Sequence, residues 1–365
     1  MMPSFGLIVL DANQEQSYYR DIGNHAASFG LTVHRFIPNA IDPYTEKITG
    51  ETFDSGVWKP ETFTIPDVLY DRCFYRTRQA FKTNAPIVEW LKNRAPFLGF
   101  GLPNKWKVYE TLKNDPYLGH YTIETMKIDR VDTVLKELEK RKNVLLKPET
   151  GSQGKGIFII KKHAGQFTVQ TDRQGKTVTK TFLQKAHLKK WLNTQSARTT
   201  FLLQPFLALQ NEHHQPFDIR IVVQKNSDGT WRERGRGIRV GKKDGLVSNL
   251  HNQGQLMNFT EWAKTLPYAK RTHLKNELVS IVERVPPLLE AAFGPLFELG
   301  LDIGVDRDGA IWILEANSKP GYRTLIESGG ISQEQIAEAP LHYARHLLKE
   351  KELTNHAPSS ETSKD

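Results

Sequence analysis

Short apolar runs separated by polar stretches organise the first hundred residues of the sequence. Residues 6–10, 31–36 and 66–72 have the length and alternation of β-strands, and a polar stretch of helical character follows the first run. This order predicts an α/β unit. The third run ends in Asp71 and Arg72, which could face a ligand at the carboxyl end of a sheet, although an ordinary salt-bridged strand end is equally compatible with them.

The middle of the chain changes from helical to strand-like spacing. Apolar positions in residues 131–141 follow the i, i+3, i+4, i+7 rule and predict an amphipathic helix. Residues 143–147 and 156–160 are predicted strands, and the alternation over 166–182 predicts a hairpin. Residues 274–293 also have helical spacing, but two adjacent prolines inside this stretch are expected to break or restart the helix.

A glycine-rich segment joins the two predicted strands in the middle of the chain. Residues 147–156 read Lys-Pro-Glu-Thr-Gly-Ser-Gln-Gly-Lys-Gly. Three glycines and a serine leave backbone N–H groups uncovered, so the loop can approach a phosphate closely, and Lys147 adds a positive charge. The segment lacks the Gly-Lys-Ser/Thr and the following helix of a Walker A loop. A phosphate-binding flap and a flexible glycine hairpin with solvent-facing lysines fit this segment equally well.

A second candidate site is a hairpin rich in acidic residues. Two apolar runs flank Asp308-Gly309, the preferred two-residue turn of a tight hairpin. This turn places Asp302 directly opposite Glu315, and Asn317 points from the same face. Because opposed like charges are destabilising, two carboxylates and an amide oxygen here favour a bound Mg²⁺ or Mn²⁺. A solvent-facing pair of acids is the alternative.

Two further stretches lie between the glycine loop and the acidic hairpin. Residues 201–207 form an apolar run that contains Pro205. The carbonyl of Pro205 and the N–H group of the next residue are free to pair with an adenine edge, and an edge strand explains the proline equally well. Asp218 and Arg220 share one face of the next predicted strand, and several arginines up to Arg239 follow. Arginines at alternating strand positions suit phosphates or carboxylates, and they also suit a solvated basic strand.

Composition narrows the class of protein. The chain has 365 residues, of which 38% are hydrophobic, and this length predicts two or three packed lobes. Its 50 basic and 41 acidic side chains give a formal net charge of +9, which suits an anionic partner. The basic residues are dispersed, so we expect neither a nucleic acid nor a membrane as partner. A single cysteine, Cys73, excludes an intrachain disulfide and a multi-cysteine zinc site, and it favours a cytoplasmic setting.

Taken in order, these motifs resemble those of ATP-grasp enzymes, and most closely those of the endospore coat-associated YheC/YheD family, which is related to RimK-type glutamate ligases. Each motif is weak alone, but seven in one order are specific. They are Asn104-Lys105-Trp106, Leu146-Lys147-Pro148 with its glycine loop, Leu203-Gln204-Pro205-Phe206, Phe217-Asp218-Ile219-Arg220, Arg239-Val240-Gly241, Ser248-Asn249-Leu250-His251 and Leu314-Glu315-Ala316-Asn317.

The resemblance implies a role for each matching position. The nucleotide-binding set begins with two lysines that contact the phosphates, Lys105 and Lys147, and the phosphate loop, Gly151, Ser152, Gln153, Gly154, Lys155 and Gly156. It continues with the adenine-facing hinge, Gln204, Pro205 and Phe206, the ribose contact Asp218, and Asn249 near the phosphates. Arg220 and Arg239 match positions that face the transferred phosphate or the acceptor, and with Lys147 they form the catalytic set. The magnesium ligands match Asp302, Glu315 and Asn317.

The sequence departs from the ligase relatives at three places. Pro205 stands where the hinge is often acidic, Val247 stands where the glutamate ligases often carry arginine, and residues 210–215 look lengthened. The resemblance implies an α/β (α+β) ATP-grasp fold. Its expected parts are an N-terminal pre-ATP-grasp domain over residues 1–102, an ATP-grasp domain over 103–350 with a nucleotide lobe at about 120–205 and a metal-binding lobe at about 206–350, and a flexible tail over 351–365.

The function implied by the resemblance is that of an ATP-dependent carboxylate–amine ligase acting through an acylphosphate. ATP and Mg²⁺ or Mn²⁺ would be its cofactors, and its carboxylate and amine substrates are not identified by the sequence. The family also implies a link to endospore coat formation, a cytoplasmic location associated with the spore coat, and spore-coat proteins as further partners. The alternative is a structural protein of the spore coat that binds nucleotide without catalysis.

Overall fold

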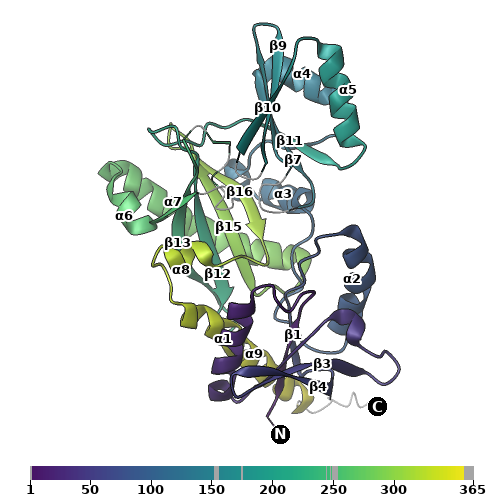
Figure 1. Ribbon diagram of the computed structural model, residues 1–365. Coiled ribbons are helices and arrows are strands. Elements are labelled where there is room, and N and C mark those ends of the chain that lie inside the picture. The colour runs from purple at the N-terminus through teal and green to yellow at the C-terminus, as the bar shows by residue number, and fades with distance from the viewer. Residues whose placement is uncertain are drawn as a thin grey trace, which may run out of the picture.

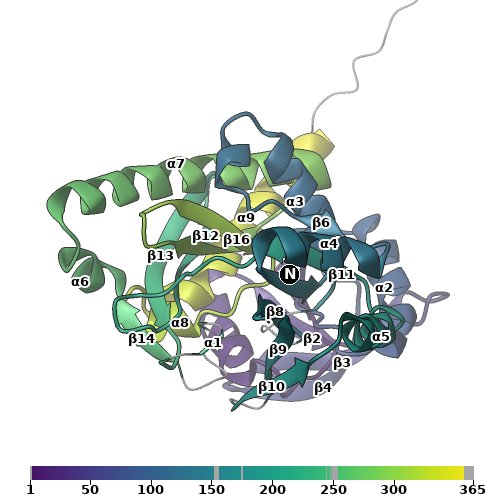
Figure 2. The ribbon, with the colours of Figure 1, turned by 90° about the horizontal axis from the view of Figure 1, so that it is seen from above.

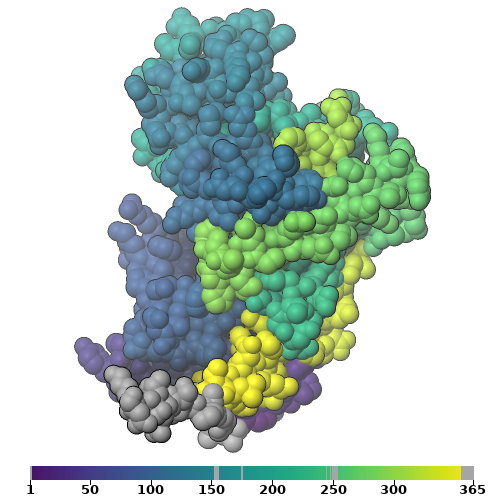
Figure 3. Space-filling model, turned by 180° about the vertical axis from the view of Figure 1, so that it is seen from behind, coloured from purple at the N-terminus to yellow at the C-terminus, as the bar shows by residue number. Residues whose placement is uncertain are grey.

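The computed structural model describes residues 2–151, 156–173, 176–243, 245–246, 248 and 254–356. Within these residues the strands form three sheets, of five, six and five strands, which follow one another from bottom to top of Figure 1 in the order first, third, second. The second sheet forms a lobe that projects at one end of the molecule, as the view from behind shows (Figure 3). No helix in the described part of the chain is long and apolar enough to cross a membrane.

The first sheet contains the three strands expected from the apolar runs, together with a hairpin. Its order is β4-β3-β2-β1-β5, in which β1, β2 and β5 are parallel and β3 and β4 are antiparallel. The strands are β1 (Ser4–Ile8), β2 (Thr32–Phe36), β3 (Lys47–Asp54), β4 (Val57–Thr64) and β5 (Val68–Asp71), and the helices of this region are α1 (Gln16–Ala26) and α2 (Arg78–Lys92), with 3₁₀ turns at Ala27–Phe29 and Pro38–Ala40.

The second sheet is antiparallel and has the order β10-β9-β8-β7-β11-β6. Its elements are β6 (Met126–Lys127), α4 (Val131–Arg141), β7 (Asn143–Pro148), β8 (Phe158–His163), β9 (Gln166–Arg173), β10 (Lys176–Phe182), α5 (Lys185–Ser196) and β11 (Phe201–Pro205). The predicted helix over residues 131–141 is confirmed. Helices α4 and α5 pack on one face of this sheet through a common apolar cluster. The opposite face carries Lys147 and points toward the third sheet.

The third sheet has the order β14-β13-β12-β15-β16. Its strands and the helices around it are α3 (Lys105–Asn114), a 3₁₀ turn (Leu118–Tyr121), β12 (Phe217–Lys225), β13 (Trp231–Val240), β14 (Gln255–Asn258), α6 (Phe259–Lys264), α7 (Tyr268–Phe293), β15 (Glu298–Val305), β16 (Ile311–Asn317), α8 (Arg323–Glu327) and α9 (Gln333–His356). Helix α7 lies along one face of the sheet, which Figure 2 shows from above. The other face carries the polar residues of the candidate site.

Helix α7 runs without a break through Pro286 and Pro287, so the expectation that these prolines interrupt the helix is wrong. Each proline lacks an N–H group and therefore removes one hydrogen bond of the helix. Apolar residues on the turns before and after the pair are fully buried in the same cluster on the third sheet, and this packing holds the two halves on one axis. They are Leu278, Ile281, Val285 and Leu289.

Helix α9 returns to the first sheet and packs beside α1 (Figure 1). Ile336 and Leu348 of α9 are buried in the same apolar cluster as Leu7 of β1 and Ile22 of α1. The sequence assigns most of this helix to the metal-binding lobe, and it assigns residues 351–356 to the tail. The helix includes those six residues, and residues 357–365 lie outside the described part of the chain.

A buried ion-pair cluster connects the first sheet to the third. Arg72, at the end of β5, is fully buried, and its Nη1 lies 2.7 Å from Oε1 of Glu298 on β15. Its Nη2 lies 2.5 Å from Oε1 of Glu15, which precedes α1. Asp71 lies 2.8 Å from Lys319 Nζ. The polar end of the third predicted strand is therefore salt-bridged within the protein.

Candidate active site

The polar face of the third sheet carries a row of charged side chains. The strand register places Asp218 opposite Arg239 and Arg220 opposite Asp302. Opposed residues of antiparallel strands point to the same face, so these side chains meet. Arg239 Nε donates to Asp218 Oδ1 over 2.6 Å, and Arg239 Nη2 lies 2.9 Å from Asp302 Oδ1. Arg220 Nε lies 2.8 Å from the same Asp302 oxygen, and the Ser248 hydroxyl donates to Asp218.

The two arginines of this row differ in their electrostatic surroundings. Burial lowers the pKa of Arg220, and the neighbouring Asp302 opposes this effect only in part. Burial acts on Arg239 in the same direction, but the Asp218 and Asp302 carboxylates outweigh it and raise its pKa. Arg239 is therefore better compensated by its neighbours than Arg220, and both guanidinium groups remain charged at neutral pH.

The acidic hairpin of β15 and β16 places Asp302 directly opposite Glu315, as expected, but the predicted two-residue turn is wrong. Asp306 N donates to Ala310 O, so the loop has three residues, and Gly309 adopts a φ of +90° in it. This loop shifts the pairing next to it by one residue. A register shift between Asp302 and Ile303, with Leu314 as the extra residue of β16, restores the expected pair.

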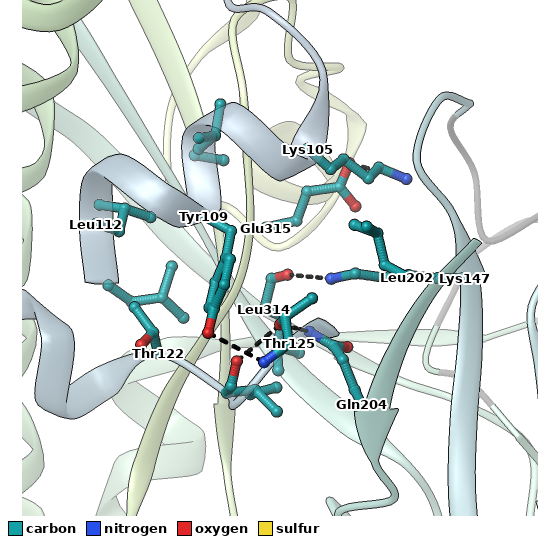
Figure 4. A pocket seen from close by; sticks show the side chains of 14 residues that line it. Lys105, Tyr109, Leu112, Thr122, Thr125, Lys147, Leu202, Gln204, Leu314 and Glu315 are labelled. Carbon is teal, nitrogen blue, oxygen red and sulfur yellow. Dashed lines mark hydrogen bonds and ion pairs between the residues drawn. The ribbon is translucent and has the colours of Figure 1, made fainter. Parts of the chain in front are cut away.

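Two lysines from other elements approach the acidic hairpin (Figure 4). Lys147 on β7 donates from Nζ to the Leu314 carbonyl over 3.3 Å, so it joins the second sheet to the third. Burial lowers the pKa of Lys147 to about 8; Glu315 opposes the shift and Lys105 adds to it. Lys105 lies at the start of α3, where Asn104 caps the helix, and its Nζ is 3.6 Å from Glu315 Oε1.

A pocket between α3, β7, β11 and β16 lies beside these lysines (Figure 4). Gln204 lines it, and its side-chain amide donates to the Thr125 hydroxyl over 2.8 Å. Tyr109 of α3 accepts from the Thr125 backbone N–H over 3.1 Å. The sequence does not single out Thr125 or Tyr109, because no local motif marks a threonine that contacts a glutamine 79 residues away.

Besides Lys105, Lys147 and Gln204, none of the described residues of the expected nucleotide-binding set lines this pocket. Pro205 pairs with Val144 in the second sheet, and the Phe206 ring lies 5.7 Å from Lys161 Nζ. Gly151 and Gly156, at the two ends of the glycine loop, adopt φ values of +122° and +76°, which favour glycine. Other predicted residues lie outside the described part of the chain: Ser152, Gln153, Gly154, Lys155, Val247 and Asn249.

The donor set of the hairpin fits a hard divalent cation. Two carboxylates face each other, and Asn317 follows on the same strand, opposite Gly300. Asp302 Oδ1 is buried, and among the described residues it has ion-pair contacts but no partner in hydrogen-bond geometry. Oxygen ligands without histidine or cysteine are those that Mg²⁺ and Mn²⁺ prefer. The residues present therefore fit the expected metal.

The arrangement of sheets around this site is found in solved ligases. The ATP-grasp ligase PsnB, solved with a minimal precursor, matches 93% of this chain and 99% of its own, with a TM-score of 0.55 and 12% identity. The D-alanine–D-alanine ligase from Coxiella burnetii matches 97% of this chain and 98% of its own, with a TM-score of 0.54 and 11% identity. The molecule thus has the ATP-grasp fold, and the expected fold class is confirmed.

The chain belongs to the YheC/D-like ATP-grasp family, whose model matches residues 94–347. It is 34% identical over 353 residues to the endospore coat-associated protein YheC of Bacillus subtilis (strain 168), and the match covers 96% of this chain and 97% of the relative. The resemblance drawn from the seven ordered motifs is therefore confirmed.

Proposed function

We propose that this protein is an ATP-dependent carboxylate–amine ligase that acts through an acylphosphate and takes part in endospore coat formation. One observation carries the proposal: Asp302 and Glu315 face each other across the hairpin, and Lys105 lies 3.6 Å from Glu315. Lys147 reaches the same hairpin from the second sheet. The ATP-grasp fold, which is typical of ligases, supports the assignment.

The reaction would proceed in two steps. A carboxylate oxygen of the substrate attacks the γ-phosphorus of ATP, the bond between the β- and γ-phosphates breaks, and ADP leaves. The acylphosphate is then attacked at its carbonyl carbon by an amine. An amide bond forms as the acyl C–O bond breaks, inorganic phosphate leaves with the bridging oxygen and the electron pair of that bond, and the amine loses a proton. Such chemistry depends on positioning and on neutralisation of charge rather than on a protein nucleophile.

The charged residues of the site have distinct roles in this proposal. Lys105 and Lys147 would contact the nucleotide phosphates, while Arg220 and Arg239 would face the transferred phosphate or the acceptor. Asp302, Glu315 and Asn317 would hold Mg²⁺ or Mn²⁺, which when bound neutralises phosphate charge. The hinge, the glycine loop, Asp218 as ribose contact and Asn249 complete the proposed nucleotide site.

Substitution of Glu315 tests the proposal. Glu315→Ala removes one of the two facing carboxylates, so release of ADP in the presence of Mg²⁺ should fall to background with a panel of amino acids and peptides as acceptors. Glu327→Ala is the matched control, because Glu327 is a more exposed acid that pairs with Arg323 on α8. Unchanged turnover in Glu315→Ala would refute the metal assignment.

A second candidate is a structural protein of the spore coat that binds nucleotide without catalysis. The name of the B. subtilis relative describes an association with the endospore coat, not a reaction, and this favours the second candidate. In both cases we propose a cytoplasmic location associated with the spore coat and spore-coat proteins as partners. The two candidates differ in one measurement: the structural protein binds an ATP analogue but forms no ADP with any acceptor.

A further inference from the structure

The carboxylate of Asp302, the expected metal ligand, forms ion pairs with two arginines in this structure. Its Oδ1 lies 2.8 Å from Arg220 Nε and 2.9 Å from Arg239 Nη2. Its second oxygen, Oδ2, accepts from Arg220 Nη2 over 3.3 Å. Both oxygens of the carboxylate therefore face guanidinium groups, at the position where a divalent ion would bind.

The charged side chains around the hairpin carry a small positive excess even without a metal. Among the described residues, the charged side chains gathered here are four cations and three carboxylates: Lys105, Lys147, Arg220, Arg239, Asp218, Asp302 and Glu315. A bare divalent ion would add positive charge to a group that is already slightly positive, whereas a triphosphate brings several negative charges. Metal and nucleotide should therefore favour each other's binding.

We propose that Arg220 substitutes for the divalent cation at Asp302 while nucleotide is absent, and that the protein consequently takes up its metal with the triphosphate rather than alone. This inference rests on the proposed function, because it assumes that Asp302 is a metal ligand. It adds a coupling between metal and nucleotide for which one arginine is responsible.

Arg220, not Arg239, is the arginine that exchanges. Arg239 has a second carboxylate partner, Asp218, whose Oδ1 accepts from it over 2.6 Å. Arg220 has Asp302 as its one ion-pair partner among the described residues. When a metal takes Asp302, Arg239 keeps a partner, while Arg220 becomes available to an incoming anion. Gly300 leaves room for this guanidinium, because a Cβ at that position would lie 2.6 Å from Arg220 Nη1.

Binding of Mn²⁺, followed by electron paramagnetic resonance, tests the proposal without turnover. The wild-type protein should bind Mn²⁺ weakly alone and at least about tenfold more tightly with a non-hydrolysable ATP analogue. Arg220→Gln should bind Mn²⁺ alone about tenfold more tightly than the wild type, because the competing cation is gone. Arg220→Lys keeps the charge and should stay close to the wild type.

A matched control is Arg35→Gln, since Arg35 is buried to a similar degree and pairs with Glu51 over 2.6 Å in the first sheet. It should leave Mn²⁺ binding unchanged. If Arg220→Gln does not fold, the wild type alone decides: equal Mn²⁺ affinity with and without the analogue overturns the inference. If Arg220→Gln folds and binds Mn²⁺ alone like the wild type, the inference is also overturned.

Asp302→Asn separates this inference from the proposed function. Suppose that Asp302→Asn no longer binds Mn²⁺ with the analogue, while Arg220→Gln binds Mn²⁺ as the wild type does. This pair of results refutes the exchange by arginine and leaves the metal site intact. Unchanged Mn²⁺ binding in Asp302→Asn refutes the metal site and the proposed function with it.

Discussion

Nucleotide affinity should fall as pH rises above neutrality, because Lys147 loses its proton early. Its pKa is lowered to about 8, since burial disfavours the charged form and Lys105 adds repulsion, while Glu315 only partly compensates. With this value the protonated fraction decreases from about three quarters at pH 7.5 to about one tenth at pH 9. If only the charged form binds phosphate, affinity falls roughly eightfold, about 1.2 kcal/mol.

Calorimetric titration with ADP at fixed Mg²⁺ between pH 7.5 and 9 measures this effect, because the phosphates of ADP titrate below that range. Lys147→Arg should show no decline, since arginine keeps its charge throughout. Lys162→Arg is the control: Lys162 lies on β8 and pairs with Glu139 of α4, and this variant should show the same decline as the wild type. Constant wild-type affinity, or the same decline in Lys147→Arg, would refute the reasoning.

The contribution of Lys147 to the free energy of unfolding should rise with pH, whereas nucleotide affinity falls. In the unfolded chain Lys147 keeps its proton up to the ordinary pKa of 10.5. Between pH 8 and 10.5 the unfolded state therefore binds more protons than the folded state, and the free energy of unfolding contributed by this residue rises with pH. Urea denaturation should therefore show that the difference in free energy of unfolding between the wild type and Lys147→Met rises across this range, and a constant difference would contradict the reasoning.

Two further substitutions test the packing beside Arg220 and the buried ion pair between the first and third sheets. Gly300→Ala places a methyl group 2.6 Å from Arg220 Nη1 and 2.8 Å from Pro320 Cβ, so ADP formation should fall by about tenfold or more; an unaltered rate in a folded variant contradicts this. Arg72→Met leaves Glu298 buried without its cation and should cost about 3–5 kcal/mol in urea denaturation. Adding Glu298→Gln should recover part of that loss, and a cost below about 1 kcal/mol would show that the pair contributes little.

The acidic hairpin shows how far spacing alone can predict a site. The opposed placement of Asp302 and Glu315 was predicted correctly although the turn was not, because the longer loop and the extra residue in β16 compensate each other. A bulge inside an apolar strand has no sequence signature comparable to that of a turn. The correct pair therefore depended on an irregularity that the sequence did not reveal.

Contacts between distant strands could not be predicted from the sequence. The alternation of polar and apolar residues places Asp218 and Arg220 on one face of their strand, but it does not predict which strand pairs with it. The order β13-β12-β15 brings Arg220 to Asp302, which lies 82 residues further along the chain. The sequence offered an arginine array suited to phosphates or carboxylates, or a solvated basic strand. The buried row of ion pairs depends on strand order, which periodicity does not encode.

The return of helix α9 to the first sheet has a consequence for synthesis on the ribosome. Phe5 and Leu7 of β1 share their apolar cluster with Ile336 and Leu341, which emerge from the ribosome more than three hundred residues later. The first sheet cannot complete its core until helix α9 has been translated. Nascent chains should therefore expose apolar surface on α1 for most of elongation and bind chaperones there.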